Sequence, residues 1–197
     1  TNAFEAGSLY LLKVNVRGGA DEIYLTKDKK FLIAGDVIST ASGEKLSVPA
    51  DLSKVSGNEA FTYGTGNDEY VLFTDPECPY CKKFESYLPQ IKDKIKIKVM
   101  FFPLDFHKNA KAISTYVMSK ENDDAMANAL FNTTKDSADF KNRKIDAATQ
   151  AKLDKKLETQ INIGKELGVQ GTPAVFDKAG NKVSWVAMLA KYGIKVQ

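Results

Sequence analysis

The only two cysteines of the chain lie in the sequence Cys78-Pro79-Tyr80-Cys81, where an apolar stretch gives way to a helical pattern. Residues 69–75 predict a buried strand, and Pro79 suits the first position of the helix that follows. Cys78 is therefore expected at a helix N-terminus, where unpaired backbone N–H groups and the helix dipole favour a thiolate. Cys81, one turn deeper, would attack a mixed disulfide formed at Cys78. The pair predicts thiol–disulfide exchange, with Cys78 as nucleophile and Cys81 as resolving thiol.

Other roles for the cysteine pair explain the sequence less well. A structural disulfide across so short a loop would remove little entropy from the unfolded chain. Structural zinc takes four cysteine or histidine ligands, whereas the chain offers two cysteines and one histidine, His107. An iron–sulfur cluster fails for the same reason, because four thiolates usually hold it. We expect no metal site and no cofactor, and we expect His107 to be a surface or loop residue.

The charge composition argues against nucleic-acid binding. The chain has 28 Lys and Arg residues against 25 Asp and Glu, with a net charge of +3. Its only arginines are Arg17 and Arg143, and no basic cluster is interleaved with aromatic residues. No stretch has the length of a membrane span. The chain starts at Thr1 instead of methionine, so we expect a mature form from which a secretory signal has been removed.

The first part of the chain predicts a small β-rich module. We expect strands at residues 9–17, 22–27 and 31–40. A module of this size cannot bury enough surface alone, and its outer strands would leave backbone groups unpaired, so it calls for a partner. Residues 49–56 predict a short helix and residues 58–68 a flexible junction. We therefore place the N-terminal module at 1–48 and a linker at 49–68.

Residues 69–197 predict an α/β domain with a helical insertion at about 108–160. After the Cys78 helix, lysines alternate with apolar residues at 94–100, as in a strand buried on one face. Helical patterning then dominates the middle of the domain. Strands and helices therefore alternate around an inserted helical region.

Particular residues mark the ends of these elements. Asn122 is suited to cap a helix of the insertion, and Gly168 is suited to end its last helix. The following residues predict a hairpin between strands at 174–176 and 181–186, with a terminal helix after it. The hairpin and this helix would complete the domain.

The cysteine pair and a downstream proline together resemble the thioredoxin superfamily. In that family a Cys-X-X-Cys helix start is paired with a loop proline held in the cis form, and Thr172-Pro173 would be that loop. The resemblance implies that this loop faces the cysteines and that its backbone pairs with an incoming substrate strand. It assigns Thr172, Pro173 and an exposed Tyr80 to substrate binding. Without the resemblance, Pro173 could equally be a proline at the entry to a strand.

Longer motifs look like the DsbC/DsbG family of periplasmic disulfide isomerases. These are Thr-Asp-Pro-Glu-Cys-Pro-Tyr-Cys-Lys-Lys-Phe at 74–84 and Gly-Val-Gln-Gly-Thr-Pro-Ala-Val at 168–175, and residues 22–47 resemble the family's cystatin-like dimerisation module. The resemblance implies a thioredoxin fold with a helical insertion, preceded by that module, in a periplasmic homodimer. Thioredoxins themselves carry a buried acid six residues before the first cysteine, where this chain has Leu72.

The resemblance also implies the activity and the partners. We expect an isomerase or reductase that reshuffles wrong disulfides in misfolded or oxidised exported proteins. Such an enzyme must be kept reduced, which implies a membrane electron donor of the DsbD type. Three other functions stay open: a reductase of sulfenic acids on lone cysteines, a dithiol oxidase, and a non-enzymatic chaperone. The direction of exchange depends on a reduction potential that spans about −270 to −120 mV among Cys-X-X-Cys proteins.

Charged residues beside the cysteines are expected to have opposing effects on thiolate formation at Cys78. Asp75 and Glu77 are expected to oppose thiolate formation at Cys78. The helix dipole and the two lysines that follow Cys81 are expected to favour it. The sequence leaves the balance between them open.

Overall fold

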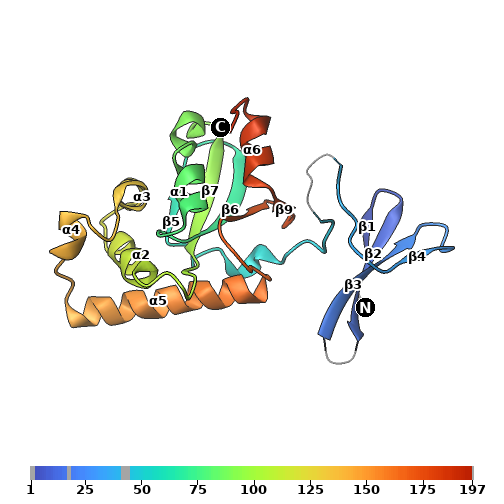
Figure 1. Cartoon of the computed structure of the whole chain (residues 1–197), viewed down its shortest axis with the longest axis horizontal. Helices are drawn as coiled ribbons and strands as arrows, with labels where there is room; N and C mark the ends of the chain where they lie inside the picture. The colour runs from blue at the N-terminus through green and yellow to red at the C-terminus, as the bar shows by residue number, and fades with distance from the viewer. Residues whose placement is uncertain (1–2, 17–18, 41–44, 197) are drawn as a thin grey trace.

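The structure, a computed structural model of the chain, describes residues 3–16, 19–40 and 45–196. Figure 1 shows a small sheet at the N-terminal end and a larger α/β domain, joined by one segment of chain. The larger domain holds the two cysteines. The described residues thus comprise an N-terminal four-stranded sheet followed by an α/β domain.

The N-terminal part is an antiparallel sheet with strand order β1-β2-β3-β4. Its strands are β1 (Ala3–Ala6), β2 (Leu9–Val16), β3 (Gly19–Thr26) and β4 (Leu32–Ile33). The first strand was not predicted, and the strand expected at 31–40 is wrong in length, because only Leu32 and Ile33 pair with β3. Beyond them, the described residues of this stretch make only an isolated bridge between Ile38 and Lys45. β4 is thus a short edge strand.

The linker predicted at 49–68 is wrong for most of its length, because the chain packs on the α/β domain from Ala50 onwards. The Ala50 N–H donates to the carbonyl of Gly180 at 2.8 Å. Gly180 has a φ of +86°, and a Cβ there would lie 2.1 Å from the Ala50 carbonyl oxygen, so this contact requires glycine. The predicted helix at 49–56 is only a 3₁₀ turn, η1 (Leu52–Lys54). The supposed flexible junction contains a sheet strand, β5 (Phe61–Tyr63).

The α/β domain is built on a sheet with strand order β5-β7-β6-β8-β9. The remaining strands are β6 (Asp68–Thr74), β7 (Ile95–Phe101), β8 (Ala174–Asp177) and β9 (Lys182–Val183). β6 and β7 are parallel, and every other pair is antiparallel. The strands predicted at 69–75 and 94–100 and the hairpin after Pro173 are therefore confirmed. The second hairpin strand, predicted at 181–186, is wrong in length, because β9 ends at Val183 and α6 begins at Trp185. β6 lies at the centre of the sheet and leads directly to Cys78.

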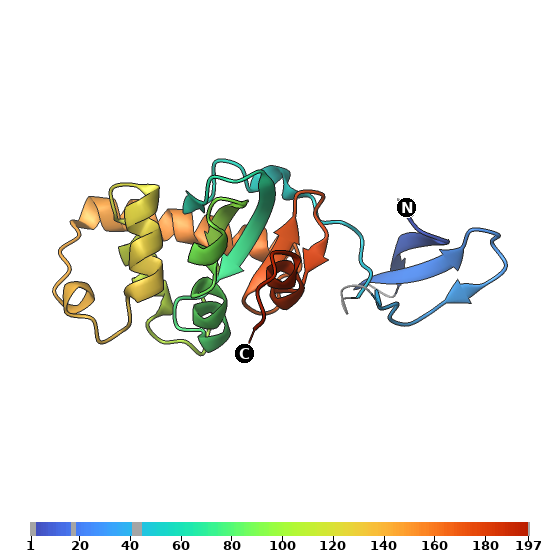
Figure 2. The same cartoon turned by 90° about the horizontal axis from the view of Figure 1, so that it is seen from above.

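Alternate side chains of β6 enter two separate apolar cores. Tyr70 and Leu72 join the core on one face, while Val71 and Phe73 join the core on the other. The first core is covered by α1 (Pro79–Glu85), the turn η2 (Leu88–Ile91) and α6 (Trp185–Lys191). The second packs against the C-terminal part of α5 (Ala147–Glu166). Figure 2 shows α5 on the opposite side of the sheet from α1 and α6.

The helical insertion lies between β7 and β8. It consists of α2 (Ala110–Met118), α3 (Asp123–Asn132), α4 (Ala138–Lys141) and α5. Asn122 caps α3, since its Oδ1 accepts the Ala125 N–H at 2.9 Å, and Gly168, with a φ of +74°, follows the end of α5. Both predicted helix boundaries are confirmed. Buried Gln160 fixes α5 to β7, because its Oε1 accepts the Phe101 N–H at 2.8 Å.

Candidate active site

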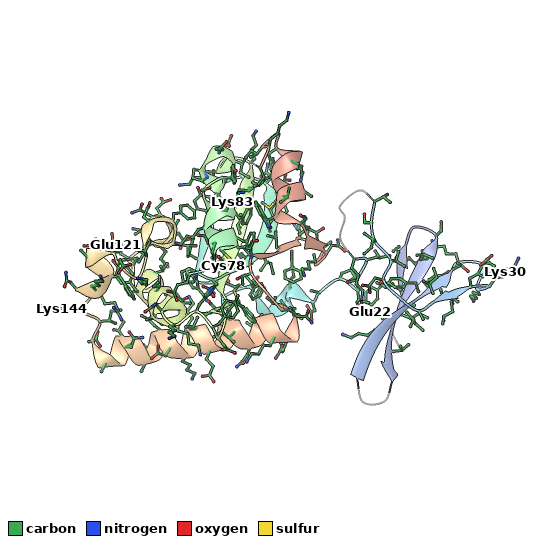
Figure 3. All side chains as sticks on the ribbon, in the orientation of Figure 1. Glu22, Lys30, Cys78, Lys83, Glu121 and Lys144 are labelled. Carbon is green, nitrogen blue, oxygen red and sulfur yellow. The ribbon has the colours of Figure 1, made fainter. Side chains whose placement is uncertain are left out.

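Cys78 is the N-cap residue of α1, as the sequence predicted. Its backbone is extended (φ −76°, ψ 122°), and Pro79 occupies the first turn. Its N–H donates to the Asp75 carbonyl at 3.0 Å, and its own carbonyl accepts the Lys82 N–H at 3.0 Å. Figure 3 places Cys78 at the start of α1. The sulfur therefore lies among the unpaired N–H groups of the first helical turn.

The loop before β8 faces the cysteines. The Thr172–Pro173 peptide bond is cis, as the resemblance implied. The Cys78 Sγ lies 3.3 Å from the Thr172 carbonyl oxygen and donates to it when protonated. Tyr80, in the first turn of α1, is 67% exposed, as predicted. The structure thus brings Cys78, Cys81, Thr172 and Pro173 together, with Tyr80 on the surface next to them.

The pKa values of the two thiols are shifted in opposite directions, although the two residues lie one helical turn apart. Both are free and buried, with 4% of Cys78 and none of Cys81 exposed. A hydrogen bond from the Cys81 thiol is the main cause that lowers the pKa of Cys78 to about 5. Backbone N–H groups of the first turn act in the same direction, whereas burial opposes them. Burial, together with the hydrogen bond to Cys78, raises the pKa of Cys81 far above that of an ordinary thiol.

A buried carboxyl group lies behind the resolving thiol. Glu85 is 1% exposed, and its Oε1 accepts the Thr74 hydroxyl at 2.6 Å. Thr74 also acts on Cys81, because it lowers the pKa of that thiol against the larger effect of burial. The Glu85 Oε2 is buried without a hydrogen bond, and burial raises the pKa of Glu85 to about 8. Thr74 therefore acts on both the resolving thiol and the buried carboxyl group.

Lys82 connects the active-site helix to the helical insertion. Its ammonium donates to the carbonyls of Leu130 and Thr133, at the end of α3. It also lies 4.0 Å from Glu85 Oε2, and burial lowers its pKa. The lysine thus satisfies carbonyls that a helix end leaves free. Lys83, the next residue, is exposed on the outer side of α1 (Figure 3).

The two acidic residues before Cys78, Asp75 and Glu77, form hydrogen bonds to the neighbouring loop at residues 104–109. Asp75 is buried, and its Oδ2 accepts the Leu104 N–H at 2.7 Å and lies 2.8 Å from His107 Nδ1. Glu77 accepts both the backbone N–H and the side-chain amide of Asn109, at 2.6 and 2.9 Å. His107 lies in a loop, in agreement with the expectation of a surface or loop residue. Its side chain is 18% exposed and lies against Asp75.

The match to known families covers most of the larger domain. Residues 63–189 match the model of a thioredoxin-like domain. The chain belongs to the thioredoxin-like family. The match begins at Tyr63, the last residue of β5, and ends within α6.

Relatives and folds of this thioredoxin-like chain agree with that assignment. A probable thiol:disulfide interchange protein DsbC of Bordetella parapertussis is 27% identical over 178 residues, which cover 86% of this chain and 59% of that protein. The chain therefore spans about three fifths of the length of the curated relatives it matches. The resemblance to DsbC proteins that the sequence motifs indicated is confirmed.

Two solved structures share the thioredoxin-like fold. They are the thiol-disulfide exchange protein α-DsbA2 of Wolbachia pipientis and oxidised BdbD of Bacillus subtilis. The first has a TM-score of 0.53 at 18% identity and covers 71% of this chain and 88% of its own. The second has a TM-score of 0.52 at 18% identity and covers 81% of this chain and 97% of its own. At this identity the two show the fold alone.

The described residues also bear on membranes and metals. In that part of the chain, no helix combines the length and the apolarity needed to cross a membrane. Within the same residues, no three or more His, Cys, Asp and Glu side chains are grouped as metal ligands.

Sequence reasoning missed Glu85, Thr74 and the anchoring of the loop by Asp75 and Glu77. Helical spacing offered a signal for Glu85, since it lies four residues after Cys81 and shares the buried face of α1 with Phe84. The partners of Asp75 and Glu77 lie 29 to 32 residues away along the chain, and no local pattern identifies contacts of that range.

Proposed function

We propose that this thioredoxin-like chain is a thiol–disulfide oxidoreductase that acts as a disulfide isomerase or reductase on exported proteins in the periplasm. The observation that carries the proposal is the unequal pair of thiols at the start of α1. One is acidic, with a pKa of about 5, and the other is held protonated by burial. At neutral pH the reduced site holds one thiolate nucleophile and one reserve thiol.

The first step is attack on a wrong disulfide of the substrate. The Cys78 thiolate forms a bond with one substrate sulfur, the substrate S–S bond breaks, and the second substrate sulfur leaves as a thiolate. That thiolate is then free to attack another disulfide in the same substrate. If a substrate thiolate attacks the mixed disulfide in turn, Cys78 leaves as a thiolate and the substrate has been isomerised without net redox change.

The second step releases substrates that do not rearrange. Cys81 attacks the Cys78 sulfur of the mixed disulfide, a Cys78–Cys81 disulfide forms, and the substrate leaves reduced. Cys81 must lose its proton first. We propose that the ionised form of Glu85 accepts that proton by way of the Thr74 hydroxyl, which donates to Glu85 Oε1 at 2.6 Å. Because the pKa of Glu85 is about 8, this form is the minority at neutral pH and grows as the pH rises. The carboxyl thus replaces the buried acid that is missing at Leu72.

The thiolate environment also bears on the reduction state. A group that stabilises the Cys78 thiolate stabilises the reduced form of the pair and so raises its reduction potential, a property of dithiol oxidases as well as of isomerases; the reactivation experiment below decides between them. Each reductive turnover leaves a Cys78–Cys81 disulfide, and two electrons from a dithiol donor must reduce it. We propose a membrane donor of the DsbD type for this step.

The N-terminal sheet is proposed to join two copies of the chain. Four of its large apolar side chains are exposed, namely Phe31, Leu32, Ile33 and Ile38. Leu32 and Ile33 form the short edge strand β4, with Phe31 before it and Ile38 after it, and among the described residues β4 pairs with β3 on one side only. An edge strand bordered by exposed apolar residues favours pairing with another chain. The occupant we propose is the same sheet of a second copy.

The experiment that tests the function is reactivation of a scrambled multi-disulfide protein in a mild glutathione buffer, with Cys78→Ala alongside. We expect catalytic amounts of the wild type to restore activity and the variant to restore none. Oxidation of a reduced substrate without reactivation would identify an oxidase. Protection from aggregation by both proteins, without reactivation by either, would identify a chaperone, and either result would overturn the proposal.

A further inference from the structure

The loop between β7 and α2 carries an aromatic side chain into solvent beside the active site. This loop, residues 104–109, contains Phe106, which is 74% exposed. The neighbouring His107 ring lies 4.4 Å from the Phe106 ring, between centroids. An exposed aromatic side chain on a loop is often mobile and without a role. The hydrogen bonds that hold this loop distinguish it from such a case.

The loop is fixed at both ends to the residues that precede Cys78. Asp75 binds the Leu104 N–H and the His107 ring, and Glu77 binds Asn109 through its backbone and its side chain. Asp75 is fully buried, and its backbone carbonyl accepts the Cys78 N–H at 3.0 Å. The same few residues therefore position the nucleophile and the loop. The loop backbone on both sides of Phe106 is therefore held next to the segment that leads to Cys78.

In the described residues of the thioredoxin-like domain, the two most exposed large apolar side chains lie on segments next to Cys78. They are Phe106 at 74% and Tyr80 at 67%. Tyr80 follows Cys78 in the chain, and the Phe106 loop is bound to the residues before it. The nucleophile thus has an exposed aromatic side chain on each of these two segments.

We infer that Phe106 is a specificity-determining residue that contacts the polypeptide flanking a substrate disulfide. The inference rests on the proposed function and names the class of substrate that the site favours. Cysteines are among the most buried residues of folded proteins, so the residues around a protein disulfide are commonly apolar, and a misfolded chain exposes them. An aromatic side chain beside the attacking sulfur gives such residues a surface to pack on.

The charges of the loop support an apolar partner. Asp105 and Lys108 flank the Phe106–His107 pair, both are exposed, and their formal charges cancel. The loop therefore presents an aromatic ring without a net charge. A peptide that follows the backbone of the Thr172–Pro173 loop must pass Cys78, because the Cys78 Sγ lies 3.3 Å from the Thr172 carbonyl oxygen. Phe106 would contact residues of that peptide beyond the reacting sulfur.

The test compares Phe106→Ala with the wild type on two substrates. One is a scrambled multi-disulfide protein, and the other is glutathione disulfide, a small peptide without apolar side chains around its sulfurs. The matched control is Val186→Ala, which trims an exposed apolar residue (44% exposed) on α6. We expect kcat/KM of Phe106→Ala to fall about three- to tenfold further for the scrambled protein than for glutathione disulfide, mainly through KM. The control should show no such difference between the substrates.

Two results would overturn the inference. Equal losses of kcat/KM on both substrates would mean that Phe106 acts on the thiol itself or not at all. A substrate-dependent loss in Val186→Ala of the same size would mean that any exposed apolar residue has this effect. A wild type that exchanges with neither substrate would instead overturn the proposed function, so the two failures are distinguishable.

Discussion

The N-terminal sheet and the thioredoxin-like domain differ in how far they bury their apolar side chains. In the described residues of the N-terminal sheet, Leu11 and Tyr24 are buried, whereas Phe31, Leu32, Ile33 and Ile38 are exposed. The thioredoxin-like domain buries two complete cores and exposes large apolar side chains at Tyr80, Phe106 and Val186. The domain can therefore fold around its own cores, while the sheet is built for a partner. Changes in one part should leave the function of the other intact.

The largest effect is expected at Cys81. Cys81→Ala keeps the nucleophile but removes the resolving thiol, so mixed disulfides with substrates should persist until an external thiol is added. Non-reducing electrophoresis and mass spectrometry would detect them. Partners with several cysteines would fit an isomerase, whereas partners with one cysteine would fit a sulfenic acid reductase. Because the change lies in the domain, the oligomeric state should not alter.

The next largest effect is expected at Glu85, whose buried carboxyl group makes the stability of the fold depend on pH. Its pKa rises from 4.5 to about 8 on folding, so the folded state binds the proton more tightly and the stability of the wild type falls as pH rises between these values. Glu85→Gln cannot ionise and should be more stable than the wild type above pH 8, by on the order of 4 kcal/mol. Urea unfolding at pH 5 and pH 9 would measure this.

The same variant should slow the release of substrate, because the Cys81 proton loses its acceptor. The matched control is Glu166→Gln, an exposed carboxylate paired with Lys54, which should change stability by less than about 0.5 kcal/mol. Equal stability of Glu85→Gln and the wild type at both pH values would contradict the account of Glu85.

A change in the N-terminal sheet should separate assembly from chemistry. Leu32→Glu places a charge in the proposed dimer contact and should weaken self-association at least about 100-fold, because each 1.4 kcal/mol is a factor of ten. Sedimentation analysis would measure it, with Lys30→Glu at the tip of the same sheet as control (Figure 3). Exchange with glutathione disulfide should remain. A wild type that is monomeric at all concentrations would refute the dimer.

The smallest effect is expected where the active-site helix meets the insertion. Lys82→Met leaves the carbonyls of Leu130 and Thr133 without their partner and should lower the free energy of unfolding by about 1–3 kcal/mol. Lys83→Met, on the exposed side of the same helix, should change it by less than about 0.5 kcal/mol. Chemical denaturation would measure the free energy of unfolding of both variants. Equal values for Lys82→Met and Lys83→Met would show that Lys82 does not join α1 to α3.

The sequence predicted best what local patterns control. The β6 strand, the start of α1 at Cys78, the cap at Asn122 and the end of α5 at Gly168 all follow from local spacing and capping. The position of Thr172-Pro173 came from a family resemblance. Local patterns failed where distant segments decide the structure. β5 was taken for a flexible junction because its three residues become a strand only by pairing with β7.

The sequence predicted the reacting cysteines of the site but not the roles of the residues that surround them. Both cysteines and the proline loop were identified, because cysteine spacing and helix starts are visible in the chain. The effect of Asp75 and Glu77 on Cys78 was left open, and their carboxylates bind the 104–109 loop instead. Glu85 was overlooked because an acid inside a helix normally faces solvent, and only packing of α1 on the sheet buries it.

The central claim is that Cys78 is a thiolate at neutral pH while Cys81 is a thiol. The most direct test is the rate of alkylation of the fully reduced protein by iodoacetamide as a function of pH, with the modified residue identified by mass spectrometry. We predict modification at Cys78 with a midpoint near pH 5, and protection of Cys81 throughout. A midpoint above pH 8, or equal modification of both cysteines, would contradict the account.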